Sequence, residues 1–122
     1  MIGYKYPNKD RRILIFKPIR REGEDGTITT EKHYLTAKGA YIKAYMIDIT
    51  VQSSDTPTKI PTNQTTIIIN WRDEITDECY VEYCGETFQV RGVDSLDYRK
   101  TEMRLLGQLT TGPSYDTVTY GG

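Results

Sequence analysis

Apolar and polar residues alternate along most of this chain with the period of a β-strand, and no segment shows the period of about 3.6 residues that marks a helix. The clearest alternation is in "AYIKAYMID", residues 40–48. One face of this strand has the smaller apolar side chains and the other has larger or charged ones: Ile42, Ala44 and Met46 against Tyr41, Lys43, Tyr45 and Ile47. We expect the smaller set to face the core of an all-β protein.

Further strands follow from the same pattern. Residues 11–21, "RRILIFKPIRR", form a first strand, in which Pro18 fits an edge or a bulge better than a central position. Asp25-Gly26 predicts a hairpin turn, after which the β-prone residues 27–38 predict a second strand. The apolar run in "TTIIINWRDEIT", residues 65–76, suits a strand covered on both faces, with Trp71 at its wetter end.

The second half of the chain predicts a hairpin and a last strand. Residues 78–94, "ECYVEYCGETFQVRGVD", alternate on both sides of Cys84-Gly85, where the chain folds back. Residues 101–111 complete the strands. We therefore predict one domain, residues 11–111, built as a small antiparallel β-barrel of about six strands, because closure removes exposed sheet edges.

Three segments lie outside this predicted barrel. Residues 1–10 form an N-terminal arm, and residues 112–122 form a C-terminal arm in which Val118 and Tyr120 can dock elsewhere. Residues 49–66 contain six Thr, two Ser and two Pro but only two charged side chains, which predicts a long inserted loop. A compact domain rarely keeps so long a connection without a use for it.

Charge and hydropathy limit the functions that are compatible with this fold. The 122 residues carry a net charge of -1, so no positive field is available to hold nucleic acid non-specifically. No stretch approaches the roughly 20 apolar residues of a membrane span, and the N-terminus lacks the apolar core of a signal peptide. The sequence therefore predicts a soluble protein made in the cytoplasm, without a membrane partner.

Candidate chemistry is sparse. Cys79 and Cys84 point to opposite faces of an extended strand, which predicts two reduced thiols, and with His33 they are too few for zinc. Nothing implies a base beside a nucleophile. The acidic run Asp73, Glu74, Asp77 and Glu78 is typical of a solvated turn and only secondarily of a cation site. We predict a non-enzyme without catalytic residues, metal or cofactor.

The order of these segments resembles that of the bacteriophage head–tail joining family, also called head-completion or stopper proteins. The resemblance covers residues 11–110 and includes "RRILIFKPIRR", the "EDG" turn and "AKGAYIKAYM". Its most specific part lies between residues 69 and 106, at Ile69, Trp71, Arg72, Ile75, Thr76, Tyr83, Gly85, Phe88, Gly92, Val93, Asp97, Arg99, Leu105 and Leu106. The Thr-rich segment 49–66 departs from the family, whose members often have a helix-forming stretch there.

The resemblance implies a structural protein of the virion neck, assembled in the host bacterial cytoplasm. It implies a homo-oligomeric ring, a dodecamer or a hexamer, between a portal–adaptor complex and a tail-terminator or tail protein. Double-stranded DNA would pass through the ring without sequence-specific binding, and an inserted loop would close the channel. Our candidates for the channel lining share small polar or weakly charged side chains: Gln52, Ser53, Ser54, Asp55, Thr56, Thr58 and Lys59. Our candidates for the interfaces are arginine and aromatic residues: Arg11, Arg12, Tyr41, Tyr45, Trp71, Arg72, Tyr115 and Tyr120.

Two alternatives stay open at this point. One is a small OB-like barrel that binds single-stranded nucleic acid, because ten Tyr residues accompany a basic first strand with Arg11, Arg12, Lys17, Arg20 and Arg21. The other is a different neck-ring protein such as a tail terminator, which keeps the structural role and changes only the partner.

Overall fold

The computed structural model describes residues 8–49, 64–96 and 101–122. These ranges contain eight strands and no helix, which confirms the all-β prediction. The strands are β1 (Arg11–Glu22), β2 (Ile28–Tyr34), β3 (Ile42–Ile49), β4 (Gln64–Asn70), β5 (Tyr80–Tyr83), β6 (Glu86–Ser95), β7 (Glu102–Thr110) and β8 (Thr117–Tyr120). No helix of the described residues is long and apolar enough to cross a membrane.

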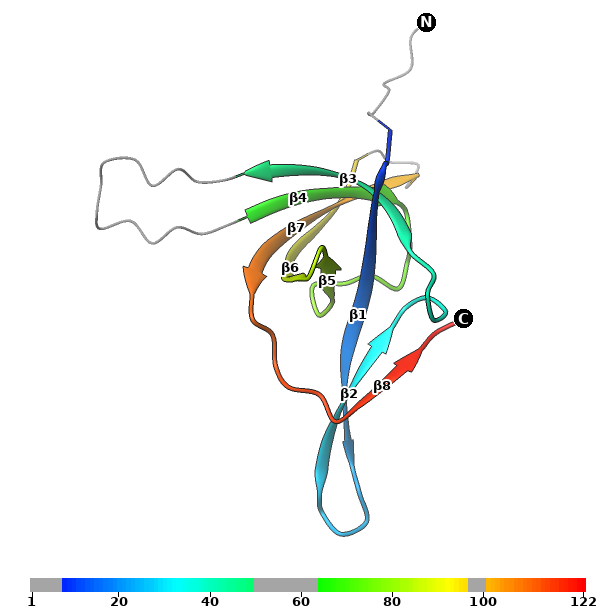
Figure 1. Cartoon of the computed structure of the whole chain (residues 1–122), viewed down its shortest axis with the longest axis vertical. Coiled ribbons are helices and arrows are strands. Elements are labelled where there is room, and N and C mark those ends of the chain that lie inside the picture. The colour runs from blue at the N-terminus through cyan, green and yellow to red at the C-terminus, as the bar shows by residue number, and fades with distance from the viewer. Residues whose placement is uncertain (1–7, 50–63, 97–100) are drawn as a thin grey trace, which may run out of the picture.

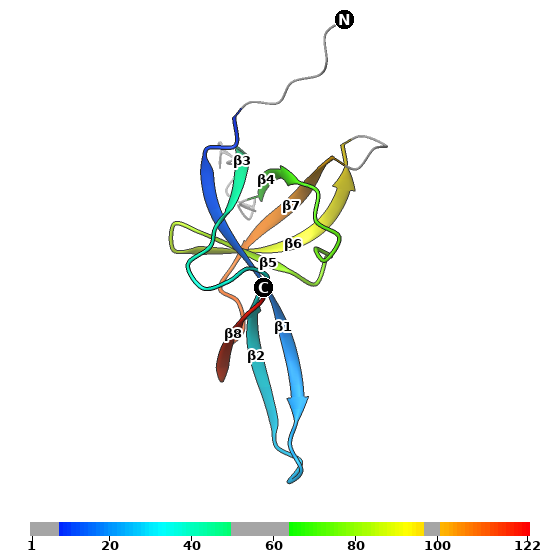
Figure 2. The ribbon, with the colours of Figure 1, turned by 90° about the vertical axis from the view of Figure 1, so that its right-hand side faces the viewer.

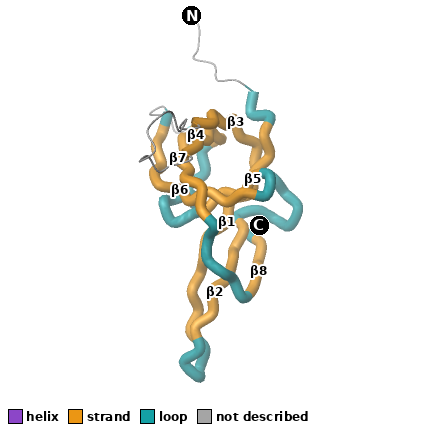
Figure 3. The backbone as a smooth tube through the Cα atoms, turned by 60° about the vertical axis from the view of Figure 1, so that its left-hand side comes forward, coloured by secondary structure: helices purple, strands orange, loops and turns teal. Residues whose placement is uncertain are grey.

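Six of the strands close into a ring, as predicted. The sheet has the order β3-β4-β7-β6-β5-β1-β2-β8, and an additional pairing joins β3 back to β1 (Figures 1 and 3). All pairings within this ring are antiparallel. The closing contact between β1 and β3 is short, because it involves only Arg11, Arg12 and Ile13 of β1. Strands β2 and β8 lie outside the ring and extend the sheet from β1.

The inside of the ring is an aliphatic core. Alternate residues point inward, so the smaller apolar set of β3 is buried, as the alternation predicts. Strand β4 is buried at four of its seven positions, including three consecutive isoleucines. Ile67 and Ile69 face the core, while Ile68 faces outward and is only 4% exposed between its strand neighbours Tyr45 and Arg104. The strand is therefore covered on both faces at Ile68, whereas Gln64 and Asn70, on the same outer side, are exposed.

Local backbone features fit the predicted turns. Cys84 and Gly85, with φ of 50° and 80°, form the two-residue turn between β5 and β6, as expected of a hairpin whose twist matches its strands. Gly26, at φ 84°, lies in the turn between β1 and β2. The pairing of β6 with β7 shifts register between Val90 and Gly92, so a bulge lies where glycine is available.

The β1–β2 hairpin projects away from the ring (Figure 2). Strand β1 pairs with β3 and β5 only as far as Phe16, and from Phe16 to Glu22 it pairs with β2. Pro18, which has no amide hydrogen to donate, therefore lies where β1 has a neighbour on one side only. This agrees with the edge position predicted for it.

The segments outside the predicted barrel differ in part from expectation. Residues 1–7 and 50–63 lie outside the described residues, but Ile49 belongs to β3 and Gln64 to Thr66 belong to β4, so the predicted loop 49–66 is too long at both ends. Ile49 and Gln64 are paired neighbours, so the connection joins two adjacent strands. In the C-terminal segment, β8 pairs in parallel with β2, a strand that the sequence analysis did not predict.

Candidate interaction surfaces

The described residues contain no group of three or more His, Cys, Asp or Glu side chains that could hold a metal ion. Two carboxylates of the acidic run pair with cations: Arg72 Nη2 lies 3.1 Å from Glu74 Oε2, and Lys17 Nζ lies 3.4 Å from Glu78 Oε1. These acids therefore belong to a charged, partly exposed surface turn.

The remaining candidates for chemistry also have structural surroundings. Cys79 is buried and Cys84 is exposed, and both are free, so the prediction of two unpaired thiols is confirmed. His33 Nδ1 lies 2.7 Å from Thr119 Oγ1, which links β2 to β8. The Thr119 hydroxyl in turn donates to Glu31 Oε2 at 2.6 Å, and Arg21 Nε donates to Glu31 Oε1 at 2.9 Å. The hydrogen bond from Thr119, followed by that from Arg21, lowers the pKa of Glu31.

An aromatic cluster covers the outer side of β1. We use this name for Phe16, Tyr34, Tyr80, Tyr115 and Tyr120. Phe16 points away from the ring core because it alternates with the inward Ile15, and yet it is only 1% exposed. The rings of Tyr80, Tyr34 and Tyr115 surround it, with centroids 5.3, 5.7 and 5.5 Å away. Tyr120 stacks on Tyr34 at 5.3 Å. These side chains form a second hydrophobic centre.

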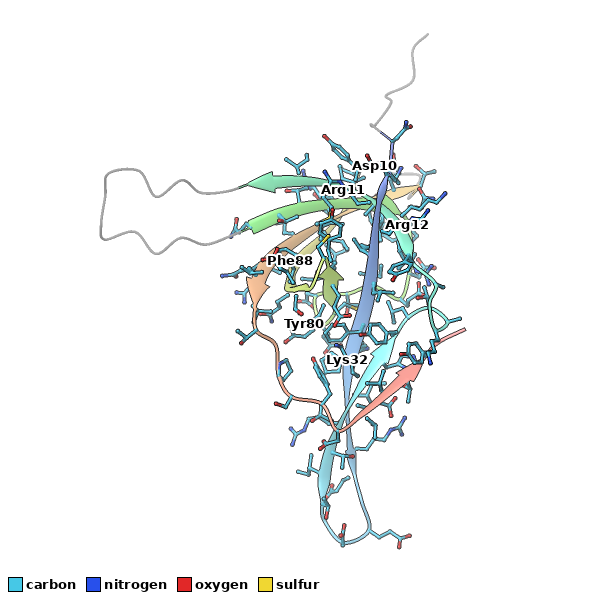
Figure 4. All side chains as sticks on the ribbon, in the orientation of Figure 1. Asp10, Arg11, Arg12, Lys32, Tyr80 and Phe88 are labelled. Carbon is cyan, nitrogen blue, oxygen red and sulfur yellow. The ribbon has the colours of Figure 1, made fainter. Side chains whose placement is uncertain are left out.

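Lys32 carries a charge into this cluster (Figure 4). Its ammonium lies 4.5 Å from the centroid of Phe16 and 5.5 Å from that of Tyr115, and it forms an ion pair with Glu82. Tyr34 donates to the same carboxylate at 2.7 Å. Burial acts to lower the pKa of Lys32, but its interactions with Glu82 and Tyr34 outweigh burial, and the net pKa shift is upward. The ammonium is therefore held charged between aromatic faces and a carboxylate.

Tyr115 is a member of the aromatic cluster whose polar group lacks a hydrogen bond within the described parts of the chain. Its hydroxyl is buried and has no hydrogen-bond partner among the described residues. Burial, with a smaller contribution from neighbouring acidic groups, raises the pKa of Tyr115 to about 12. The residue acts in this structure as a hydrophobic anchor of the C-terminal segment.

Polar contacts hold the rest of that segment. Asp116 forms two hydrogen bonds with the main chain of Thr30. The amide of Asp116 donates to Thr30 O at 2.8 Å, and its carboxylate accepts from Thr30 N at 2.8 Å. Gly121 N donates to Tyr34 O at 2.7 Å. Strand β8 ends the sheet order and exposes Val118 and Tyr120 at 49% and 43%. The C-terminal segment is thus docked against β2 and the aromatic cluster, and it still leaves Val118 and Tyr120 partly exposed.

A hollow of about 390 Å³ lies beside the start of β1. Arg12, Tyr41 and Tyr83 line it, together with Leu14 and the turn at Cys84. Tyr41 is 54% exposed, and Arg11 Nη1 donates to the Tyr83 hydroxyl at 2.5 Å. The hollow brings together two of the predicted interface residues, Arg12 and Tyr41, and a third, Arg11, contacts its lining through Tyr83.

A surface poor in charge, the ring face, covers the outside of four adjacent strands. It consists of outward side chains in two rows of directly paired residues: Ile47, Thr66, Leu106 and Gly92, then Gln64, Gln108 and Gln89. Ile47 and Leu106 are 42% and 48% exposed. Because Gly92 has no side chain, it leaves room for its neighbour Leu106. A Cβ atom at position 92 would lie 3.4 Å from Cδ1 of Leu106. The charged pair Asp94–Arg104, at 2.6 Å, and the exposed Arg91, at the bulge between Gln89 and Gly92, lie at the margin of the ring face.

The other predicted site residues are distributed over the molecule. Tyr115 and Tyr120 belong to the aromatic cluster, and Tyr45 lies on the outer side of β3 next to Ile68. Trp71 packs partly against the core and donates to Asp73, and Arg72 follows it at the end of β4. The eight interface candidates therefore do not form one surface. All channel-lining candidates, Gln52, Ser53, Ser54, Asp55, Thr56, Thr58 and Lys59, lie outside the described residues.

Sequence reasoning missed Lys32 and Glu82, and it assigned no place to Phe16. Lys32 and Glu82 lie 50 residues apart, and no local pattern brings such residues together. It also missed Leu106 and Val118 as exposed apolar positions. The strict alternation in β7 and the β-branched "TVTY" of β8 are signals that would have found them.

Comparison with known proteins shows the fold of the chain through solved structures. No family model and no curated protein matches the chain. A chain from the virion of a native gene transfer agent particle aligns with a TM-score of 0.62 and 9% identity, over 88% of this chain and 100% of its own length. The solution structure of protein SF1141 from Shigella flexneri 2a aligns with a TM-score of 0.62 and 17% identity, over 84% and 94%. These likenesses establish a shared fold.

Proposed function

We propose that this chain is a structural protein of a phage-like particle that forms an oligomeric ring in the neck, between the portal–adaptor complex and the tail. The observation that carries the proposal is the fold shared with a gene transfer agent virion chain, over the whole of that chain and 88% of this one. The segment order that resembles the head–tail joining family supports the same reading. In this role the ring joins head to tail and closes the DNA channel.

The shape of the molecule supports a role in assembly. The closed sheet is a rigid body with an aliphatic interior, and its surface offers a projecting hairpin, an aromatic cluster and a face poor in charge. Binding through extended surfaces is what such a body provides. The proposal therefore includes self-association and contacts with proteins on the head side and on the tail side, without catalysis.

Single-stranded nucleic-acid binding receives less support. Base stacking needs free aromatic faces beside an open positive groove. In this structure Tyr34, Tyr80 and Tyr115 pack on Phe16, while Lys17 and Arg21 of the basic strand pair with carboxylates. Sub-micromolar binding of single-stranded DNA with a steep salt dependence would instead favour this alternative.

A null mutant of the particle tests the proposal. Without this protein, we expect DNA-filled heads that leak and free tails beside them, visible by electron microscopy. Complementation with the wild-type chain should restore joined particles. Complete particles in the null mutant would contradict the proposal. If the null mutant instead makes joined particles that lose their DNA, the protein would be needed to close the channel but not to join head to tail.

A further inference from the structure

Two exposed apolar surfaces lie on opposite sides of this molecule. The described residues include seven exposed large apolar side chains, and four of them belong to the ring face or to β8: Ile47, Leu106, Val118 and Tyr120. In the closed ring β7 is the third strand from β1 in both directions, so the outer side of β7 faces away from that of β1. Strands β2 and β8 extend the sheet from β1 (Figure 3). The ring face and β8 therefore point to different sides.

Both surfaces are poor in charge, although 27% of the residues in the chain are charged. Arg91 borders the ring face at the bulge of β6, and Lys32, the register partner of Val118, directs its ammonium over Phe16 in the aromatic cluster. Ring-face residues are aliphatic, small or amide-bearing, and residues 117–122 have no charged side chain. Depletion of charge around exposed apolar side chains is the compositional sign of the centre of a protein–protein interface. A solvated face of a sheet would be expected to carry Lys and Glu instead.

The hydrogen-bonding groups of the two surfaces are complementary. Gln64, Gln108 and Gln89 stand side by side on β4, β7 and β6, and their amides have no partner among the described residues. Each amide both donates and accepts. Strand β8 pairs with β2 on one side, and no described strand pairs with its other edge, which leaves main-chain donors and acceptors free.

We infer that the exposed side of β8 of one copy packs against the ring face of a second copy. Val118 and Tyr120 cover Ile47 and Leu106, and the glutamine amides bond to the open edge of β8. Because the two surfaces differ and face opposite sides, the contact is head-to-tail, and repetition of it generates a ring or a filament. This inference rests on the proposed function for its ring, and it adds the two surfaces that meet.

Charge substitutions test this contact in the full chain. Leu106→Glu and Val118→Lys each place an unpaired charge in the apolar contact, so each alone should weaken self-association by about 10- to 100-fold in sedimentation velocity experiments over a concentration series. In an equimolar mixture, the new carboxylate on the ring face of one variant would meet the new ammonium on β8 of the other, and the unmodified surfaces would meet each other. The mixture should therefore recover association, in assemblies with an even number of copies.

Ile28→Glu is the matched control. Ile28 is 53% exposed at the tip of the β1–β2 hairpin, outside both surfaces, so this variant should associate like the wild type. Circular dichroism and thermal unfolding of each variant check that the fold is kept, as the exposure of both positions predicts. A wild-type chain that stays monomeric at every concentration, or single variants that associate normally, would overturn the inference.

Other outcomes separate the inference from the proposed function. Loss of association in Leu106→Glu alone, with Val118→Lys unaffected, would overturn the head-to-tail pairing in favour of a symmetric contact. If both variants restore joining in the null mutant as well as the wild type does, the neck role stands and these surfaces are wrong. If association follows the predicted pattern but the null mutant makes complete particles, the surfaces stand and the neck role is wrong.

Discussion

Strand β1 contributes to two hydrophobic regions that are built in different ways. Ile15 points into the ring, among aliphatic side chains whose strands are paired on both sides. Its neighbour Phe16 points outward, into rings held by a lysine, a carboxylate and the last residues of the chain. The ring core depends on close packing inside a closed sheet, whereas the aromatic cluster depends on a segment that can detach from a sheet edge.

This difference separates stability from attachment. Removal of an aliphatic group from the ring affects all six strands, because the core has no free side onto which it can relax. Loss of the C-terminal segment would expose the aromatic cluster but leave the ring pairings unchanged. We therefore expect the ring to set the global free energy of unfolding and the cluster to govern local opening near β8.

The largest expected effect comes from the ring core. Ile15→Ala creates a cavity at a fully buried position and should lower the free energy of unfolding by about 2–5 kcal/mol, measured by urea denaturation. Unfolding can be followed by circular dichroism and by the fluorescence of Trp71, which lies beside the core. Both probes should report the same loss of stability. A loss below about 1 kcal/mol would mean that the core relaxes around the cavity and that the two regions are less different than described.

The next effect concerns the charge within the aromatic cluster. Lys32→Met keeps most of the apolar stem but leaves Glu82 without its cation, so stability should fall by about 1–3 kcal/mol. Lys43→Met on the exposed side of β3 is the control and should change stability by less than about 0.5 kcal/mol. Hydrogen exchange should show the loss of protection in β8 and β2 before that in β4. Equal loss in all strands would contradict the separation of the two regions.

A smaller effect is expected at the hairpin turn of the ring. Cys84 has a φ of 50°, a conformation that asparagine adopts more readily than cysteine. Cys84→Asn should therefore raise the free energy of unfolding by about 0.5–1 kcal/mol, with Glu86→Asn as a control outside the turn position. Thermal unfolding measures the change, and a lower melting temperature for the Asn variant would contradict it.

The smallest effect at neutral pH belongs to Tyr115. Because the folded pKa of this phenol is about 12, above its ordinary value of 10.0, the neutral form favours the folded state. Its contribution is complete below pH 10 and is lost as the pH rises toward 12. Tyr115→Phe should change stability by less than about 1 kcal/mol at pH 7 and should make the loss above pH 10 less steep. Urea denaturation between about pH 9 and 11.5, with Tyr41→Phe as an exposed control, measures this, and identical pH profiles would contradict it.

Local patterns predicted the ring well because its residues alternate with strand period. The β3 alternation, the triple isoleucine of β4 and the Cys84-Gly85 turn each depend on nearby residues only. Sites formed by residues far apart in the sequence were harder to predict. The side chain of Tyr115 packs in an environment formed by Phe16, Tyr34 and Tyr80, which come from three strands. No spacing in the sequence indicates that these residues converge.

The C-terminal strand shows a second reason for incomplete prediction. Residues 117–120 contain two Thr, one Val and one Tyr, all β-prone, but their few apolar side chains indicated an arm. Pairing with β2 satisfies main-chain groups without requiring much apolar burial, and this contribution does not show in a hydrophobic pattern. The same limit applies to the ring face. The alternation in the sequence indicated which residues point outward, but not which of them lie side by side on neighbouring strands.

Both ends of the described chain are joined to the sheet by short ladders, and this has a mechanical consequence. At the N-terminal end, β1 meets β3 through three residue pairs, and at the C-terminal end β8 meets β2 through four. A force applied at either terminus therefore acts first on a ladder of only three or four residue pairs. The seven-pair ladders of β1 with β2 and of β4 with β7 would bear load only after these ends had yielded. Tension carried through the termini would thus reach the ring in two steps, the first at low force.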